Sequence, residues 1–187
     1  MGKLICTEIT SLDGYINDED GKFDWSAPDP EVHQFVNDLE RPIGTYLYGR
    51  RLYEVMKYWE TAHLQPEVSP VELDYAQVWQ SADKVVYSGT LDKVDSERTR
   101  IERSFDPDAV RALKETTDAD LSIGGPTLSA HAYRAGLVDE VRLLISPVIV
   151  GGGTRALPDR VRVDLSLAEE RRFGNGVVYL RYDVTRS

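Results

Sequence analysis

The sequence predicts an α/β fold, a three-layer αβα sandwich in which helices cover both faces of one mixed, mostly parallel sheet. Apolar, β-rich segments alternate with helical patterns over roughly the first 135 residues. Such alternation is typical of parallel sheets, because parallel neighbours need a crossover connection. The last third instead holds two long strand-like segments, 140–150 and 177–184, with no helical pattern between them. We therefore expect the sheet to end in antiparallel strands.

The individual elements follow from composition and from helix-start signals. We expect strands at 3–9, 45–49, 84–88, 121–125, 140–150 and 177–184, and helices at 30–39, 51–59, 70–80, 107–116 and 126–135. Three of these helices begin with a proline that follows Asp29, Ser69 or Asp106, which suits an N-cap and a first turn. Segment 161–173 forms either another strand or an irregular edge, and residues 174–176 (Gly-Asn-Gly) form a turn.

Length and composition favour one domain that covers residues 1–187. The chain is 41% hydrophobic, which is enough for a substantial core, and Cys6 is its only cysteine, so no internal disulfide can form. The N-terminus has no apolar run of signal-peptide length, and no segment approaches the roughly 20 apolar residues of a membrane helix. We expect a cytoplasmic protein that has no membrane partner.

The formal net charge of −10 limits the possible ligands. Nucleic acids and anionic membranes attract clustered lysine and arginine, so an acidic chain disfavours both as partners. A phosphorylated small molecule would need local compensation, either from arginines or from backbone N–H groups at helix starts.

Gly49 and the three residues after it form the first candidate anion site. Gly49 ends a predicted strand, and Arg50, Arg51 and Leu52 open a predicted helix. Glycine lets a phosphate approach the backbone, the helix start supplies N–H donors, and the arginines add positive charge. The alternative is an ordinary strand-to-helix turn with solvated arginines.

A second strand end repeats this pattern. Ile123 is followed by Gly124 and Gly125, and Thr127 and Leu128 lie in the first turn of the next predicted helix. Ligands of open α/β sheets bind at this carboxyl edge. The spacing differs from the G-x-G-x-x-G fingerprint, which excludes a Rossmann assignment. A plain turn is again the alternative.

Two further turns follow predicted strands. Ser88, Gly89 and Thr90 offer two hydroxyl groups and a flexible backbone that could contact a ribose or a phosphate. Asp13 and Gly14 form a turn dipeptide after the first strand, and the Asp13 carboxylate could point into a cleft. Each segment could instead be only a turn.

Taken in order, these pieces resemble the dihydrofolate reductase superfamily over essentially the whole chain. The matching segments are SLDGYI, GRRLYE, KVVYSGTL, IGGPTL and AGLVDEVRLLISPVIVGGGTRAL. The last of them is the most branch-specific, and it is similar to the C-terminal reductase domain of the bifunctional deaminase-reductase of riboflavin biosynthesis. The resemblance implies a dihydrofolate-reductase-like fold and NADPH-dependent hydride transfer to a heterocyclic substrate, such as the phosphoribosylamino-pyrimidine of that pathway.

The resemblance also implies roles for the turn residues. The cofactor phosphates would be bound by Gly49, Arg50, Arg51, Leu52, Ile123, Gly124, Gly125, Thr127 and Leu128. Ser88, Gly89 and Thr90 would lie near the adenosine ribose, and the loop at Asp13 and Gly14 would cover the nicotinamide.

One departure from the family concerns the choice of cofactor. Relatives often carry Ser-Arg where this chain has Ser88 and Gly89, and that arginine helps to bind the 2′-phosphate of NADPH. Arg50 and Arg51 could compensate, so we expect NADPH to be preferred over NADH.

Glu31 and Asp13 are the candidate catalytic residues. Glu31 precedes Phe35 by four residues, which is the spacing of the carboxylate and phenylalanine in dihydrofolate reductases. On the apolar side of a helix, desolvation would favour the protonated carboxyl group, which could assist protonation of a substrate ring. Alternatively, Glu31 only complements the helix N-terminus, or Asp29 takes this position. We expect Trp25 and Phe35 to contact the substrate.

The segment 58–83 argues against folate as the substrate. It contains no lysine or arginine but five acidic residues, which would repel the carboxylates of a folate tail, and less strongly a ribose phosphate. Ala82 stands where dihydrofolate reductases place an arginine for that tail. Trp59, Tyr75 and Trp79 could form a wall for a flat substrate or belong to the core.

Two other functions stay open, a dihydrofolate reductase and a non-catalytic NADP(H)-binding module. His33, His63 and His131 have no partner at metal-ligand spacing, so we expect no metal. The relatives commonly form homodimers, and the resemblance therefore implies a homodimer that acts on a small molecule.

Overall fold

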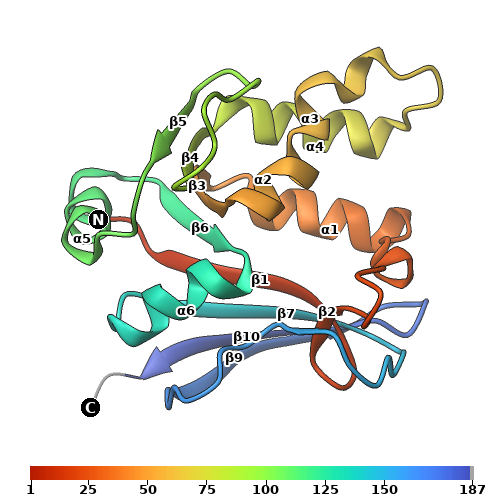
Figure 1. The fold of residues 1–187 in the computed structure, drawn as a ribbon. Helices are drawn as coiled ribbons and strands as arrows, with labels where there is room; N and C mark the ends of the chain where they lie inside the picture. The colour runs from red at the N-terminus through yellow and green to blue at the C-terminus, as the bar shows by residue number, and fades with distance from the viewer. Residues whose placement is uncertain (186–187) are drawn as a thin grey trace.

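The computed structural model describes residues 1–185 and contains one large mixed sheet (Figure 1). Its eight strands run in the order β5-β4-β3-β6-β1-β7-β10-β9. Every neighbouring pair from β5 to β7 is parallel, whereas β10 is antiparallel to both β7 and β9. The predicted mostly parallel sheet with an antiparallel end is therefore confirmed. The strands are β1 (Leu4–Ser11), β3 (Ile43–Gly49), β4 (Asp83–Tyr87), β5 (Thr99–Glu102), β6 (Asp120–Gly124), β7 (Glu140–Ser146), β9 (Asp164–Arg172) and β10 (Val178–Thr185).

The helices begin where the capping signals predicted. They are α1 (Pro30–Glu40), α2 (Arg50–Met56), α3 (Tyr58–Thr61), α4 (Pro70–Ser81), α5 (Pro107–Thr116) and α6 (Pro126–Arg134), with 3-10 turns η1 (Asp24–Ser26) and η2 (Ala62–Leu64). The side chains of Asp29, Ser69 and Asp106 each accept a hydrogen bond from the first turn of the helix that follows. No helix among residues 1–185 is both long and apolar enough to cross a membrane.

Successive residues of a strand point alternately into two hydrophobic cores, one on each face of the sheet. In β3, Leu47 joins a cluster with residues of α5 and α6, while Tyr46 and Tyr48 join a cluster with residues of α2 and α4. This alternation follows from the two-residue period of a strand. A third cluster lies between α1 and the β9–β10 end of the sheet. Helices therefore cover both faces, as the sequence predicted.

The structure corrects several predicted boundaries. The strand expected at 140–150 ends at Ser146, because Pro147 cannot donate to a ladder. The helix expected at 51–59 is divided into α2 and α3. Segment 161–173 does form a strand, β9, which a turn at 174–176 joins to β10. The short strands β5, β2 (Tyr15–Asn17) and β8 (Thr154–Arg155) were not predicted, because two to four partly polar residues leave no periodic signal.

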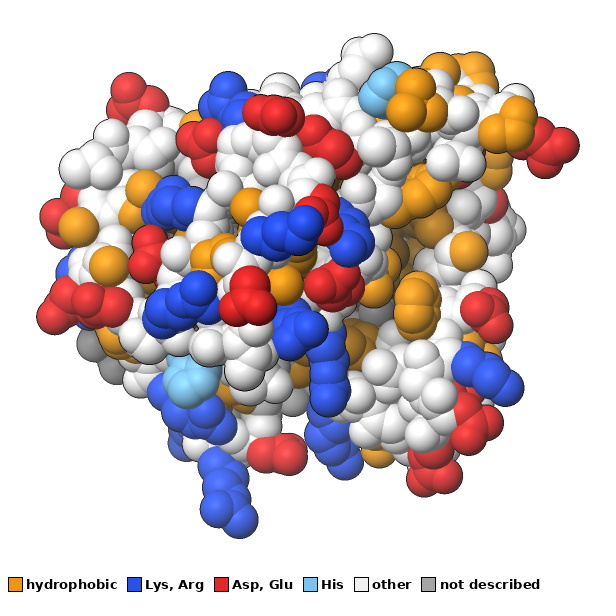
Figure 2. All heavy atoms as spheres, turned by 45° about the horizontal axis from the view of Figure 1, so that its top comes forward, with side chains coloured by type: hydrophobic (Ala, Val, Ile, Leu, Met, Phe, Trp, Pro, Cys, Tyr) orange, Lys and Arg blue, Asp and Glu red, His pale blue; other side chains and the backbone are white. Residues whose placement is uncertain are grey.

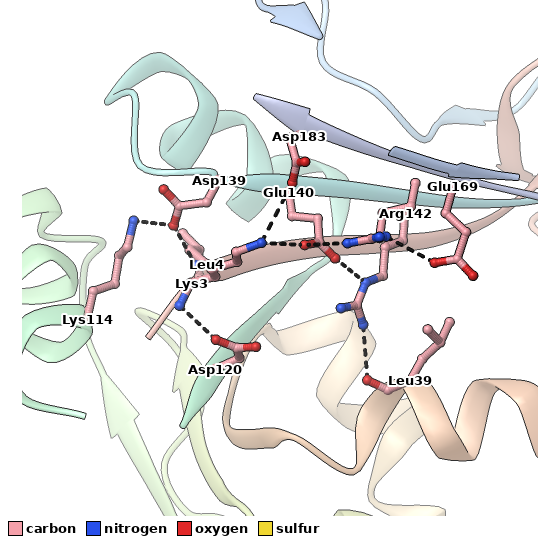
Figure 3. A network of polar contacts seen from close by, with 11 residues as sticks. Lys3, Leu4, Leu39, Lys114, Asp120, Asp139, Glu140, Arg142, Glu169 and Asp183 are labelled. Atoms are coloured by element: carbon pink, nitrogen blue, oxygen red, sulfur yellow. Dashed lines mark hydrogen bonds and ion pairs between the residues drawn. The ribbon is translucent and has the colours of Figure 1, made fainter. Parts of the chain in front are cut away.

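An ionic network around buried Glu140 links the start of β7 to Lys3, to β10 and to α1 (Figure 3). Glu140 of β7 is 2% exposed, and its carboxylate accepts hydrogen bonds from Arg142 Nε at 2.6 Å and Lys3 Nζ at 3.0 Å. Arg181 of β10 lies 3.6 Å away, and Arg142 also donates to the carbonyl of Leu39 in α1. Burial alone would raise the pKa of Glu140, but Arg142 and Lys3 outweigh it, so the pKa lies below the usual value.

We expect Glu140→Gln to lower the free energy of unfolding by about 3–5 kcal/mol, because it leaves buried Arg142 without its counter-charge. The control is Glu169→Gln. The Glu169 carboxylate lies 3.2 Å from Arg181 but is 44% exposed, so its loss should lower the free energy of unfolding by no more than about 1 kcal/mol. Urea unfolding at pH 7 measures both. The wild-type carboxylate stabilises the fold above its ordinary pKa of 4.5 and loses this effect as the pH falls through its lower folded value. Equal losses in the two variants would contradict the assignment.

Candidate active site

The turns predicted to bind an anion lie side by side at the carboxyl edge of the sheet. In the parallel register, Gly49 of β3 is opposite Tyr87 of β4, and Tyr48 is opposite Gly124 of β6. The segments that follow these strands therefore leave the sheet at the same height along the strand direction. This is the edge at which open α/β sheets bind ligands.

The two glycine turns are in direct contact. A Cβ atom on Gly124 would lie 2.4 Å from Cδ2 of Leu52, so a side chain here would displace that leucine. Gly125 has a φ of +93°, a backbone conformation that favours glycine. Neither α2 nor α6 has a side-chain cap at its N-terminus. Bare backbone is thus available at the start of α6, where a ligand phosphate could accept hydrogen bonds.

The other residues around these turns divide into core and surface. Ile123 and Leu128 are buried in the cluster beneath α6, so only their backbone groups can face a ligand. Thr127, Arg50 and Arg51 are exposed. In the space-filling view, lysine and arginine side chains gather beside a hollow lined mainly by hydrophobic side chains (Figure 2). Arg50 and Arg51 therefore place local positive charge beside these turns, on a face that also carries acidic side chains (Figure 2).

The turn after β4 is held by its own hydroxyl group and by two arginines. Ser88 Oγ accepts hydrogen bonds from the backbone N–H groups of Thr90 and Leu91, which closes the turn around Gly89. Arg50 Nη1 donates to Thr90 Oγ1 at 2.9 Å. Arg103 Nη1 donates to the carbonyl oxygens of Leu91 at 2.7 Å and Ser88 at 3.2 Å.

Arg103 was not among the site residues predicted from the sequence. It follows β5, a strand too short and too charged to be recognised, and the parallel pairing of β5 with β4 brings it to the Ser88 turn. The absence of an arginine at position 89 was a signal that a cation could come from elsewhere, but nothing in the sequence indicated which residue.

Asp13 holds a loop together in this structure. Its carboxylate accepts hydrogen bonds from the backbone N–H groups of Val150 at 3.2 Å and Gly151 at 2.8 Å. Hydrogen bonding from Ser11, and then from these N–H groups, keeps the pKa of Asp13 below its usual value. Gly14, with a φ of +86°, forms the expected turn and accepts a hydrogen bond from Ala156. The Asp13 side chain therefore binds the 147–156 loop and does not project freely into a cleft.

Glu31 does not lie on the apolar side of α1, contrary to expectation. Its side chain is half exposed, and it accepts hydrogen bonds from Gly174 N at 3.2 Å and Arg171 Nη2 at 3.4 Å. Asp29, the alternative, caps the helix. Phe35 packs edge-on against Phe173 and Tyr179, in the cluster at the β10 end of the sheet. The desolvated carboxyl group expected from the spacing is absent because α1 turns Val32 inward instead.

Two adjoining cavities lie beside α1 and share Ala27 and Pro28. The first, of about 190 Å³, is lined by Trp25, Val32, Ser146 and Asn175 among others, and none of the described residues lining it is ionisable. Ser146 ends β7, so this cavity opens at the same sheet edge as the glycine turns. Trp25 Nε1 is buried and has no hydrogen-bond partner among the described residues.

The second cavity, of about 480 Å³, is bordered by only part of the aromatic cluster expected from segment 58–83. Trp59 lines it together with His33 and Glu72, whereas Tyr75 and Trp79 are buried in the core. The aromatic wall expected for a flat substrate is thus limited to Trp59 and its neighbour Tyr58.

Comparisons with known proteins agree with this fold. Residues 2–179 match the model of the RibD C-terminal domain. The uncharacterised protein YyaP of Bacillus subtilis is 30% identical over 182 residues, which cover 96% of this chain and 94% of that protein. The crystal structure of a putative riboflavin biosynthesis protein from Shewanella has a TM-score of 0.75 at 21% identity, covering 98% of this chain and 99% of that one.

A bifunctional relative shows the same fold in part of a longer chain. The diaminohydroxyphosphoribosylaminopyrimidine deaminase/5-amino-6-(5-phosphoribosylamino)uracil reductase of Thermotoga maritima aligns with a TM-score of 0.66 at 16% identity. The alignment covers 98% of this chain but 57% of that protein. The whole-length family match and the shared architecture lead to one conclusion: this chain belongs to the RibD C-terminal domain family, and it has the dihydrofolate-reductase-like fold.

Proposed function

We propose that this protein is an NADPH-dependent reductase that transfers a hydride to a heterocyclic or pyrimidine-type substrate, as a reductase of the riboflavin-pathway type. One observation carries the proposal: two glycine turns, each leading into a helix without a side-chain cap, lie at one edge of the sheet together with Arg50 and Arg103. A cavity opens at the same edge. A family of reductase domains supports the reaction type. The binding of a phosphorylated cofactor would explain the local cations on an acidic chain.

The residues present fit NADPH. The backbone of Gly124 and Gly125 and the hydroxyl group of Thr127 would hold the pyrophosphate, with Arg50 and Arg51 beside it. When bound, the nicotinamide supplies the hydride, which is the chemistry of the cofactor itself. The protein contributes binding, orientation and the exclusion of water.

Arg103 and Arg50 would bind the 2′-phosphate that distinguishes NADPH from NADH. Both guanidinium groups border the Ser88 turn, where Gly89 offers no side chain. A guanidinium forms paired, charge-assisted hydrogen bonds with a phosphate. Arg103 thus takes over the function of the arginine that relatives carry at position 89.

The cavity lined by Trp25 would hold the reacting ring of the substrate. Ser146 and Asn175 provide polar groups, and Val32 and Pro28 provide apolar walls, so these residues position the ring but do not supply its proton.

Folate remains disfavoured, because the adjoining cavity contributes the carboxylate of Glu72, whose pKa is lowered by hydrogen bonds from Ser69. Turnover of dihydrofolate would reinstate that substrate, and cofactor binding without turnover would favour a non-catalytic module.

We also propose that the protein forms a homodimer through β9. All nine residues of this edge strand are exposed, including Leu165 at 41% and Leu167 at 50%. A long exposed edge strand pairs readily with another chain, and a second copy would remove the two leucines from water.

Fluorescence titration with NADPH and NADH is the direct test of the proposed function. We expect micromolar binding of NADPH and clearly weaker binding of NADH, because the 2′-phosphate adds contacts with arginine. If neither nucleotide bound, the glycine turns would have no cofactor role and the reductase proposal would be wrong.

We expect Arg103→Gln to weaken NADPH binding by roughly ten- to a hundredfold, which corresponds to about 1.5–3 kcal/mol for a hydrogen bond to a charged group. Its affinity for NADH should be unchanged. The matched control Arg111→Gln removes an exposed arginine of α5 that pairs with Asp108 and should change neither affinity. Equal weakening of both nucleotides by Arg103→Gln would show that this residue only supports the turn.

Sedimentation at micromolar concentration tests the dimer. We expect the wild type to sediment as a dimer and Leu167→Lys to shift it to the monomer, since the new charge would be buried at the interface. Leu64→Lys, at an exposed leucine of η2, is the control and should remain dimeric. A monomeric wild type would overturn the proposal.

A further inference from the structure

Glu8 is a buried acidic residue that the proposed function leaves unused. It lies on β1 and is 9% exposed. The Cys6 thiol lies 4.0 Å from its Oε1 atom, on the same face of the strand, and Ser129 Oγ of α6 lies 3.8 Å from that sulfur. No ion pair involves Glu8 among residues 1–185. A buried carboxyl group without a cation is costly in its ionised form.

The register of the sheet places Glu8 beside the candidate phosphate turn. The pairing of β1 with β6 ends at Cys6 and Ile123, whereas its pairing with β7 continues to Ser11. Glu8 therefore lies just beyond the end of β6, where the chain turns into α6. The backbone N–H of Gly125 donates a hydrogen bond to its carboxyl group. This N–H belongs to the turn that would face a ligand phosphate.

Burial raises the pKa of Glu8 to about 8, and the hydrogen bond from Gly125 offsets part of that shift. The titratable groups that face it are the Cys6 thiol on β1 and the Tyr133 hydroxyl on α6. Burial, followed by the charge of Glu8, raises the pKa of Cys6 to about 12, and burial raises the pKa of Tyr133 well above its usual value. Across the ladder, β7 presents Leu143. Glu8 is thus the group here that changes charge near neutral pH.

We propose that Glu8 couples occupation of the α6 phosphate site to its own protonation. A ligand phosphate at the 124–128 turn binds when the Glu8 carboxyl group is neutral and is opposed when that group is ionised. Two negative groups that compete for the Gly125 N–H in a site of low dielectric repel each other strongly. The inference rests on the proposed function, since the phosphate is the cofactor pyrophosphate. Cofactor binding then takes up a proton, and Glu8 acts as a positioning residue through Gly125.

The test is the dissociation constant for NADPH between pH 7.5 and pH 9.5, a range in which the cofactor phosphates are already fully ionised. In the wild type, we expect affinity to fall above pH 8 and to approach a tenfold loss per pH unit. Glu8→Gln keeps the shape and the hydrogen-bonding capacity but cannot ionise. Its affinity should stay constant over this range and exceed that of the wild type at pH 9.

Ser129→Ala is the matched control, because it removes a polar neighbour of Cys6 but keeps the carboxyl group, and it should retain the wild-type pH profile. A second measurement needs only the wild type: calorimetry at pH 8 in buffers of different ionisation heat should show uptake of about half a proton per NADPH bound. No uptake, or the same pH profile in Glu8→Gln and the wild type, would overturn this inference alone. Failure of the wild type to bind NADPH at any pH would overturn the proposed function with it.

Discussion

Parallel pairing of β4, β3, β6 and β1 is the constraint on which the candidate site depends. Because these strands run in one direction, the segments after Tyr87, Gly49 and Gly124 leave the sheet at one edge. Close packing of Gly124 against Leu52 then brings the two glycine turns together, since a Cβ atom on Gly124 would lie 2.4 Å from Cδ2 of Leu52. The turn of Ser88 joins them through Arg50. Without this register, the three turns would not lie at one site.

Residues that stabilise the fold and residues of the candidate site lie at opposite ends of the sheet. At the amino-terminal end, Glu140 binds Lys3 and Arg142, and this network links β1, β7, β10 and α1 (Figure 3). Glu140 and Arg142 are buried and paired with each other, so they stabilise the strands and are not free for a ligand. The carboxyl end has helix starts without side-chain caps and exposed arginines, and a cavity opens at the same edge of the sheet. The one buried acid there, Glu8, lacks an ion pair among the described residues, and so its charge can respond to a ligand.

Local charge, not net charge, decides what this surface can bind. The chain carries a formal charge of −10, yet Arg50 and Arg103 converge on one turn. Interactions between exposed charges fade beyond about 10 Å at ordinary ionic strength, so distant carboxylates weaken such a site only modestly. For the same reason, Glu72 affects a ligand in the cavity that it lines more than a phosphate at the start of α6.

The sequence by itself determined the features that depend on neighbouring residues. Helix starts at Asp29, Ser69 and Asp106, the glycine turns after β3 and β6, and the antiparallel end of the sheet were all predictable, because capping, turn formation and strand period are local properties. The tertiary structure decided which side chains share a site. It turned Glu31 toward Gly174, assigned Phe35 to a core cluster, brought Arg103 to the Ser88 turn and buried Glu8 beside Gly125. These placements depend on strand order and on helix rotation about its axis, and neither leaves a signal in the spacing of residues along the chain.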